Sequence, residues 1–261
     1  MNVNVIALVM LYLVSQMCLV WIIYRFFKNP SVVDVSWSIG LMVSGLIYLS
    51  HIPLTTRTFV ASVLLLLWAI RLAGYLWYTR VRHGHVDKRY TRLSDGWKIN
   101  QTLGFFLNFQ LQGLLIFIIS FIFYFIGSSN VSGLTYIDSI AIIISLIGIF
   151  GEVLADLQLY RFKQQNKGAV CNIGLWAYSR HPNYFFDWVT WLGFTLFALQ
   201  SNYGYFSFIS LLVLYIIFTQ ITGPMTERGS ILSRGQKYIA YQKQTSMFFP
   251  WFKKKIDSEK M

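Results

Sequence analysis

Long runs of apolar residues, separated by short polar connections, follow one another along the whole chain. Each run is long enough to cross about 30 Å of hydrocarbon as a helix that rises ~1.5 Å per residue. The runs predict seven transmembrane helices, at residues 3–27, 32–52, 58–78, 103–127, 134–157, 182–200 and 203–223. We therefore expect an all-α, multi-pass membrane protein in which residues 1–261 form a single integral membrane domain.

The composition agrees with this pattern. Hydrophobic residues make up 56% of the 261 positions and charged residues 12%, against roughly 25% charged residues in ordinary soluble domains. The lipid bilayer is therefore the first partner that the sequence predicts.

The formal charge of +12 raises the question of a nucleic-acid partner, and the placement of the basic residues answers it. If the C-terminus is cytoplasmic, 20 of the 22 Lys and Arg residues fall on the cytoplasmic side, with Arg57 outside and Arg71 within a span. This asymmetry is the positive-inside pattern, so no nucleic-acid partner is expected. The N-terminus is then outside, and the membrane is the inner one if the source is bacterial.

Cysteine and histidine spacing gives little sign of a metal or a disulfide. Cys18 and Cys171 lie on different elements without a CxxC pattern, so we expect two free thiols. His83 and His85 form the only close histidine pair, and no Cys or carboxylate has ligand spacing to them. No metal site is predicted.

Ionisable residues inside the apolar runs are costly in lipid and need a reason. Glu152 and Asp156 are four residues apart and share one helix face. Asp34, Asp187 and Arg71 fall at the same cytoplasmic depth if the orientation above holds. Together these five residues predict a buried polar cavity that opens toward the cytosol.

The connection before the sixth run is rich in groups that suit a ligand. Gly168 is expected to end the preceding helix and Gly174 to allow a tight turn. Pro182 suits the first position of a helix, whose free backbone N–H groups attract anions. His181 suits a general acid or a phosphate ligand, although an Arg-His pair at a membrane surface is more often an interfacial anchor.

The C-terminal part predicts a change from span to surface. Gly223 and Pro224 are expected to end the seventh helix. Tyr238 and Tyr241 then recur at helical spacing before Pro250-Trp251-Phe252. This pattern predicts a cytosolic amphipathic segment that lies on the headgroup surface.

An ordered set of motifs resembles a known family. The motifs are Glu152-x3-Asp156, Gly174-Leu175-Trp176-Ala177-Tyr178-Ser179-Arg180-His181-Pro182-Asn183-Tyr184, Gly223-Pro224-x2-Glu227, Tyr238-x2-Tyr241 and Pro250, with Asp34-x2-Trp37, Leu67-Trp68-x2-Arg71-Leu72, Arg80 and Asp87-x-Arg89-Tyr90 upstream. This set resembles the uncharacterised membrane family related to the C-terminal domain of steroid 5-alpha-reductases, most clearly over residues 134–252, and sterol delta-14 reductases are similar in the same half. The chain departs at Phe186-Asp187, where the family usually has Gly-Glu.

The resemblance implies a membrane-embedded reductase that takes NADPH from the cytosol and reduces a C=C bond in a lipophilic substrate, such as a sterol, another isoprenoid or an enoyl lipid. Carried over residue by residue, it implies these cofactor contacts: Asp156, Lys163, Trp176, Tyr178, Arg180, His181, Asn183, Asp187, Glu227 and Tyr241. Such a reduction also needs a proton donor. Asp34 and Tyr78 are the candidate catalytic acids.

Two other classes of function stay open. Isoprenylcysteine and phospholipid methyltransferases are similar in the same region and bind S-adenosylmethionine. They typically carry two adjacent acids where this chain has Glu227 followed by Arg228, and a basic cytosolic mouth suits a phosphate-bearing dinucleotide better than a cationic sulfonium. A non-catalytic lipid-binding protein would keep the fold without the cofactor.

Overall fold

The computed structural model describes residues 3–82, 84 and 86–254, and these residues are almost entirely helical or in connecting turns. The α-helices are α1 (Val3–Phe27), α2 (Val32–Ser50), α3 (Thr56–Leu76), α4 (Lys88–Asp95), α5 (Gln101–Gly127), α6 (Tyr136–Gln165), α7 (Pro182–Ala198), α8 (Ser207–Ile216), α9 (Gly223–Arg234) and α10 (Gln236–Gln244). Short π-helical segments follow α3 (Trp77–Val81) and α8 (Ile217–Thr222), and 3₁₀ turns cover Gly174–Ala177 and Gly204–Phe206. The described part contains no β-strand, only a single bridge between Ser179 and Ser246.

Every predicted apolar run forms a helix, which confirms the all-α membrane class. Within the described residues, six helices are long and apolar enough to cross a membrane: α1, α2, α3 with its π-segment, α5, α6 and the continuous helix from Gly204 to Arg234. The sixth predicted span, α7, has 17 residues. The structure thus supports a multi-pass membrane protein with six candidate spans.

Side-chain caps explain where several helices begin. Thr55 and Thr58 form a reciprocal capping box at the start of α3, and Asn100 caps α5 through the N–H of Thr102. The sequence did not predict α4, but Asp87 caps it by accepting from the N–H of Arg89. Pro182 begins α7 as predicted.

The expectation that Gly223 and Pro224 end the last span is wrong. The helix continues through both residues to Arg234, where Gly235 adopts a φ of +56° before α10. A proline lacks the N–H that an α-helix needs from it, and the preceding π-turn at Ile217–Thr222 changes the hydrogen-bond pattern at that point. The wider turn allows the helix to accommodate Pro224.

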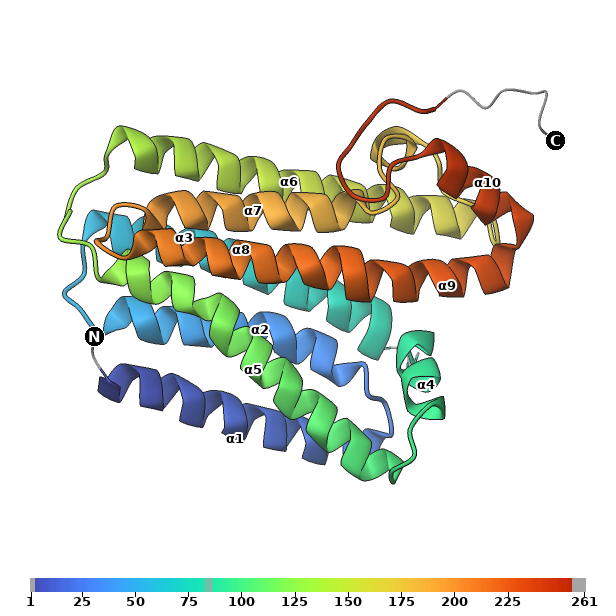
Figure 1. Ribbon diagram of the computed structural model, residues 1–261, viewed down its shortest axis with the longest axis horizontal. Coiled ribbons are helices and arrows are strands. Elements are labelled where there is room, and N and C mark those ends of the chain that lie inside the picture. The colour runs from blue at the N-terminus through green and yellow to red at the C-terminus, as the bar shows by residue number, and fades with distance from the viewer. Residues whose placement is uncertain (1–2, 83, 85, 255–261) are drawn as a thin grey trace. The chain divides into compact units, whose positions relative to one another are not determined.

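The chain divides into two compact units, and the boundaries fall inside α6, α7 and α8. The first unit comprises residues 1–142 and 194–211. In it α2 contacts α1, α3 and α5, and α5 crosses α1 and α2 obliquely (Figure 1). Its aromatic core includes the ring of Phe123 edge to face with Phe194 at 4.9 Å and the fully buried Trp68.

A buried ion pair in the first unit involves Arg57, which the sequence placed just before the third span. Arg57 stands in the first turn of α3 with 0% exposure, and its guanidinium binds Asp138 of α6 at 3.1 Å. The same guanidinium donates to the carbonyl of Phe197 at 2.6 Å, while Asp138 accepts from the N–H and hydroxyl of Thr135. The ion pair and these additional hydrogen bonds offset the cost of removing both charges from water.

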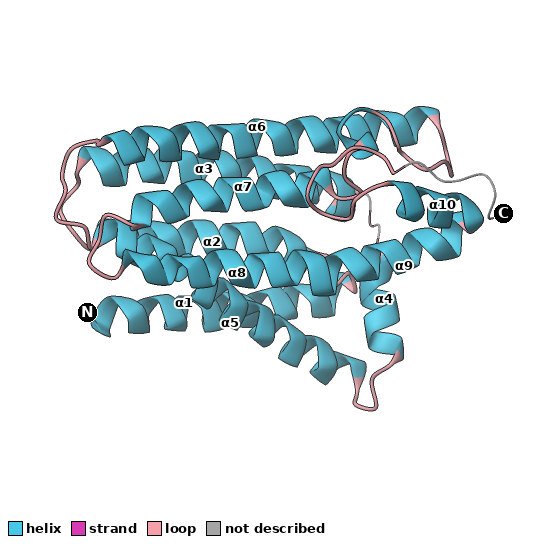
Figure 2. Cartoon of the chain, turned by 45° about the horizontal axis from the view of Figure 1, so that its top comes forward, coloured by secondary structure: helices cyan, strands magenta, loops and turns pink. Residues whose placement is uncertain are grey.

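The second unit comprises residues 143–193 and 212–261. Glycines bring α6 and α7 together here: a Cβ on Gly148 would stand 2.3 Å from the Thr190 hydroxyl, and one on Gly151 would stand 2.2 Å from the Phe186 ring. Figure 2 shows α9 followed by the short α10, which turns back beside it. Gly168 and Gly174 both adopt positive φ, as predicted for the connection between α6 and α7.

Candidate functional site

A network of charged side chains in the second unit centres on Glu227 of α9. Arg180 binds the two carboxylate oxygens through Nε at 2.6 Å and Nη2 at 3.2 Å. His181 Nε2 lies 3.2 Å from Oε1, and the amide of Gln242 donates to Oε2 at 2.7 Å. Arg180 Nη1 donates to the carbonyls of Gln242 and Thr245. The carboxylate is 6% exposed, so these contacts neutralise a buried charge.

Tyrosine and serine side chains hold the residues before α7 against the C-terminal segment. The Tyr241 hydroxyl donates to the carbonyl of Trp176 at 2.5 Å, and the Ser179 hydroxyl donates to that of Phe248 at 2.8 Å. The indole N–H of Trp176 in turn donates to the carbonyl of Ala155. Trp176 and Tyr241 therefore use their polar atoms to fix the loop that carries Arg180.

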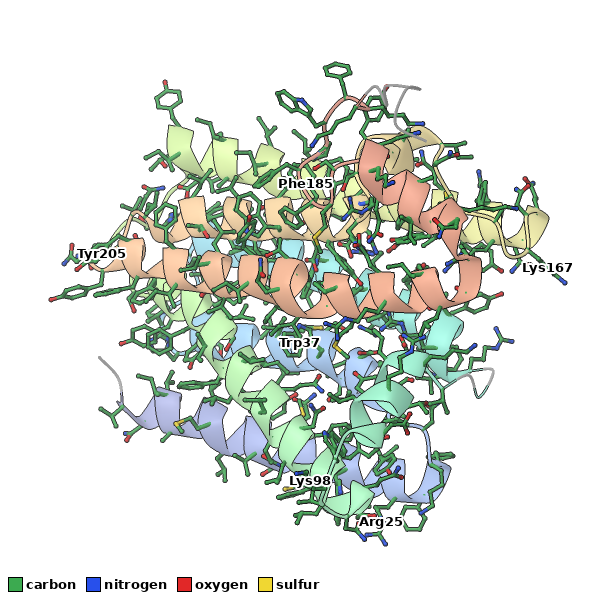
Figure 3. The ribbon with its side chains drawn as sticks, turned by 45° about the vertical axis from the view of Figure 1, so that its right-hand side comes forward. Arg25, Trp37, Lys98, Lys167, Phe185 and Tyr205 are labelled. Atoms are coloured by element: carbon green, nitrogen blue, oxygen red, sulfur yellow. The ribbon has the colours of Figure 1, made fainter. Side chains whose placement is uncertain are left out.

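A stack of rings continues from the network. His181 stacks on Tyr184 with centroids 5.0 Å apart, and Tyr184 stacks on Phe218 at 5.1 Å. Figure 3 shows Phe185, the next residue of α7, beside the C-terminal segment. Its ring meets those of Phe248 and Phe249. The helix start is thus bordered by polar groups and by an aromatic wall.

The predicted carboxylates of α6 and α7 are buried in the same unit. Glu152 and Asp156 are 3% and 4% exposed, which confirms that they share one protected face of α6. Asp156 accepts from the amide of Asn183 at 3.3 Å, and Asp187 is 9% exposed. The bulky Phe186, where the resembling family has glycine, packs against Gly151, so α6 offers room for it.

Two predicted cofactor contacts lie at the surface of the second unit. Lys163 is exposed near the end of α6, in the turn before Lys167, which Figure 3 labels. Tyr178 is 46% exposed, and its ring meets Phe252. The remaining eight predicted contacts are buried or half-buried around the start of α7.

The candidate acid Asp34 belongs to a cluster in the first unit. Arg80 Nη1 donates to its Oδ2 at 2.5 Å and Arg89 at 3.2 Å, while the Tyr90 hydroxyl donates to Oδ1 at 2.7 Å. Asp87 pairs with Arg89 at 2.8 Å. Asp34 is therefore held as an acceptor of hydrogen bonds.

Tyr78, the other candidate acid, stands in the π-segment after α3 and is 40% exposed. The Arg82 guanidinium lies 5.5 Å from its ring centroid. Sequence reasoning did not select Tyr90 as a site residue, although its hydroxyl is the one that donates to Asp34. The signal was present in the Asp87-x-Arg89-Tyr90 motif that accompanies Asp34 in the resemblance.

Burial and charge shift several acid–base equilibria outside the spans. Burial alone would raise the pKa of Asp87, but the Arg89 and Arg80 charges and the hydrogen bonds from Arg89 outweigh it and lower that pKa to about 2. Burial, followed by the Asp34 charge, raises the pKa of Tyr90 well above its usual range. Burial likewise raises the pKa of Tyr241, so both hydroxyls stay protonated donors.

Among the described residues, no three His, Cys, Asp or Glu side chains are grouped so that they could hold a metal ion. His83 and His85 lie outside the described residues. Cys18 and Cys171 are free thiols, as predicted.

A family model described as a protein of unknown function (DUF1295) matches residues 20–245. The chain belongs to the DUF1295 family. The matched range of this DUF1295 protein contains every candidate site residue of both units, from Asp34 to Tyr241. No curated protein and no solved structure matches the chain. The relation to steroid 5-alpha-reductases stays a prediction from the motifs.

Proposed function

We propose that this protein is a membrane-embedded reductase that uses NADPH to reduce a C=C bond in a lipophilic substrate. The observation that carries the proposal is the grouping of eight motif residues of the resembling reductases around the start of α7. The family description assigns no activity, so the proposal rests on this grouping together with the motif resemblance.

The donor set around α7 fits a nicotinamide nucleotide. The buried Oδ1 of Asn183 accepts no hydrogen bond from the described residues, which leaves an acceptor for an amide N–H. The carboxylates of Asp156 and Asp187 suit ribose hydroxyls. The exposed Lys163 and the positive end of α7 suit phosphates.

Arg180 has a different part in this proposal. Its donors are directed at Glu227, Gln242 and Thr245. We therefore assign it to positioning: it keeps the loop before α7 and the C-terminal segment together, and Asn183 and Asp187 provide direct contacts.

When bound, NADPH supplies the hydride that goes to one carbon of the double bond. The other carbon needs a proton, and the chain has to deliver it. Asp34 and Tyr78 are the proposed sources. The Asp34 carboxylate already accepts hydrogen bonds from Arg80, Arg89 and Tyr90, so Tyr78 is the stronger candidate.

The proposed topology has seven spans, an outside N-terminus and a cytoplasmic C-terminus. With ~1.5 Å per residue, the 17 residues of α7 extend about 25 Å, close to the ~30 Å of a hydrocarbon core. The one-sided placement of Lys and Arg supports the orientation. A C-terminal reporter that is active only in the cytosol tests it, and activity of an exported reporter at that end contradicts it.

Cofactor binding is the decisive experiment. The detergent-purified protein should melt at a higher temperature with NADPH and at an unchanged temperature with S-adenosylmethionine. Lys163→Ala should reduce the NADPH effect, and Lys254→Ala, another exposed lysine, should leave it unchanged. A larger gain with S-adenosylmethionine would support a methyltransferase, and no gain with either would support a non-catalytic lipid-binding protein.

A further inference from the structure

A shallow, open cavity of about 330 Å³ lies at the surface of the first unit, between residues near the end of α1 and residues at the start of α5. Its wall consists of Trp21, Asn100, Thr102, Leu103 and Phe106. The indole N–H of Trp21 donates to the carbonyl of Thr102 at 2.9 Å, and the Trp21 and Phe106 rings meet edge to face at 5.5 Å. The wall is therefore held in place and presents mostly apolar surface.

Basic residues lie close in the chain to the residues that line this cavity. The guanidinium of Arg25 lies 5.4 Å from the Trp21 ring, and Figure 3 shows Arg25 and Lys98 at the same end of the unit. Lys98 is exposed two residues before Asn100, and Lys28 is exposed just after α1. One acidic residue, Asp95, stands at the end of α4 before the same connection. The rim thus has an excess of positive charge.

We infer that this cavity binds an anionic phospholipid, with part of an acyl chain against Trp21, Leu103 and Phe106 and the phosphate beside Arg25 and Lys98. An apolar wall next to cations matches a molecule that joins a hydrocarbon chain to an anion. Tryptophan and basic residues at a helix end are also typical of the membrane interface. The positive end of the 27-residue α5 adds to the attraction.

The phospholipid explains both halves of the cavity, whereas free phosphate would leave the apolar wall uncovered. Leu103 is 49% exposed, and on α1, beyond Trp21 in the sequence, Ile22 and Phe26 are 45% and 80% exposed. These exposed apolar side chains of α1 and α5 would be covered by an acyl chain. The inference is independent of the reductase proposal because it uses no residue of the proposed cofactor site.

Native mass spectrometry of the full chain, released from detergent with added lipid, tests the inference. We expect phosphatidylglycerol to stay bound at collision energies that remove phosphatidylcholine. Arg25→Gln with Lys98→Gln should weaken phosphatidylglycerol binding about 25-fold, since each basic residue near an anionic headgroup contributes roughly fivefold. Phe106→Ala removes part of the apolar wall and keeps Arg25 and Lys98. It should also weaken the binding of phosphatidylglycerol.

Lys167→Gln is the matched control, because Lys167 is an exposed cation of the second unit. It should leave the lipid affinity unchanged, and inorganic phosphate at the lipid concentration should not displace the lipid. Equal retention of the two lipids, or equal loss in Lys98→Gln and Lys167→Gln, would overturn the inference. If the double variant does not fold, the phosphatidylglycerol affinity of Lys98→Gln alone tests the inference. Lys98 is exposed, so this single substitution should leave the fold intact.

Discussion

Arg180 binds both carboxylate oxygens of Glu227, at 2.6 and 3.2 Å, although 47 residues separate them in the chain. The planar guanidinium has enough donors to bind the carbonyls of Gln242 and Thr245 as well. One side chain before α7 therefore connects α9, α10 and the segment that follows. Arg180, which the resemblance implies to be a cofactor contact, makes these hydrogen bonds within the protein.

Removal of the Arg180 side chain should destabilise the protein. Arg180→Ala leaves the buried Glu227 carboxylate without its main partner, and such losses cost about 3 kcal/mol or more. Arg180→Lys should recover only part of the lost stability, because an ammonium group cannot bind both carboxylate oxygens in a planar fork. Thermal unfolding in detergent measures this, with the exposed Lys254→Ala as the control. Unchanged melting of Arg180→Ala with lost NADPH binding would assign Arg180 to the ligand instead.

Removing one partner of the Arg57–Asp138 ion pair should destabilise the protein more than replacing both partners with apolar residues. Both side chains are 0% exposed, so Arg57→Met alone leaves a buried carboxylate and should cost about 3 to 5 kcal/mol. Arg57→Met combined with Asp138→Leu removes both charges and should recover much of that loss. A double-mutant cycle on thermal or denaturant unfolding measures the coupling. Additive losses in the double variant would contradict this account.

Tyr78 and Asp34 should respond differently if Tyr78 is the proton donor. Tyr78→Phe keeps the half-exposed ring and should lower kcat about 100-fold or more, with a smaller loss of stability than Asp34→Asn. Asp34→Asn should instead lower stability, because Arg80 and Arg89 lose their shared carboxylate. Melting temperature and kcat, measured on the same samples with an enone lipid, separate the two roles. The reverse pattern would make Asp34 the donor.

The stability of the first unit should depend on pH through Asp87. Its pKa of about 2 lies below the ~3.9 of an unfolded chain, so the unfolded state takes up the proton first as the pH falls. The stabilisation is complete above about pH 4 and is lost as the pH falls toward 2. Asp87→Asn should remove this part of the pH dependence, at most about 2 kcal/mol since the side chain is partly exposed. Melting curves between pH 6 and pH 3 test it, and an unchanged slope in Asp87→Asn would contradict it.

The effects on stability of substitutions at Gly151 and Phe186 should depend on each other. Gly151→Val places side-chain atoms where the Phe186 ring lies, so we expect a large loss of stability. Phe186→Ala in the same chain should relieve the overlap and recover part of the loss. Matched melting curves of the single and double variants measure this, with Gly133→Val as a control because no atom lies within 4 Å of a Cβ there. Equal melting of Gly151→Val and its double variant would show that the overlap is not the cause.

The sequence by itself determined the helical elements and their membrane character. Apolar runs of sufficient length allow few alternatives in lipid, because an unpaired backbone is too costly there. Local geometry was predictable for the same kind of reason: Gly168 and Gly174 take positive φ, and Pro182 begins α7. These properties depend on a few neighbouring residues.

Only the tertiary structure decided which partners the charged residues have. Arg57 is buried with Asp138, a partner 81 residues away that its own sequence neighbourhood does not indicate. Pro224 continues a helix because the preceding π-turn accommodates it. Arg180 and Tyr241 were chosen as ligand contacts, yet their donors meet Glu227 and the Trp176 carbonyl. Charge and hydrogen-bond pairing depend on distances between remote segments, and those distances follow from the packing of the helices.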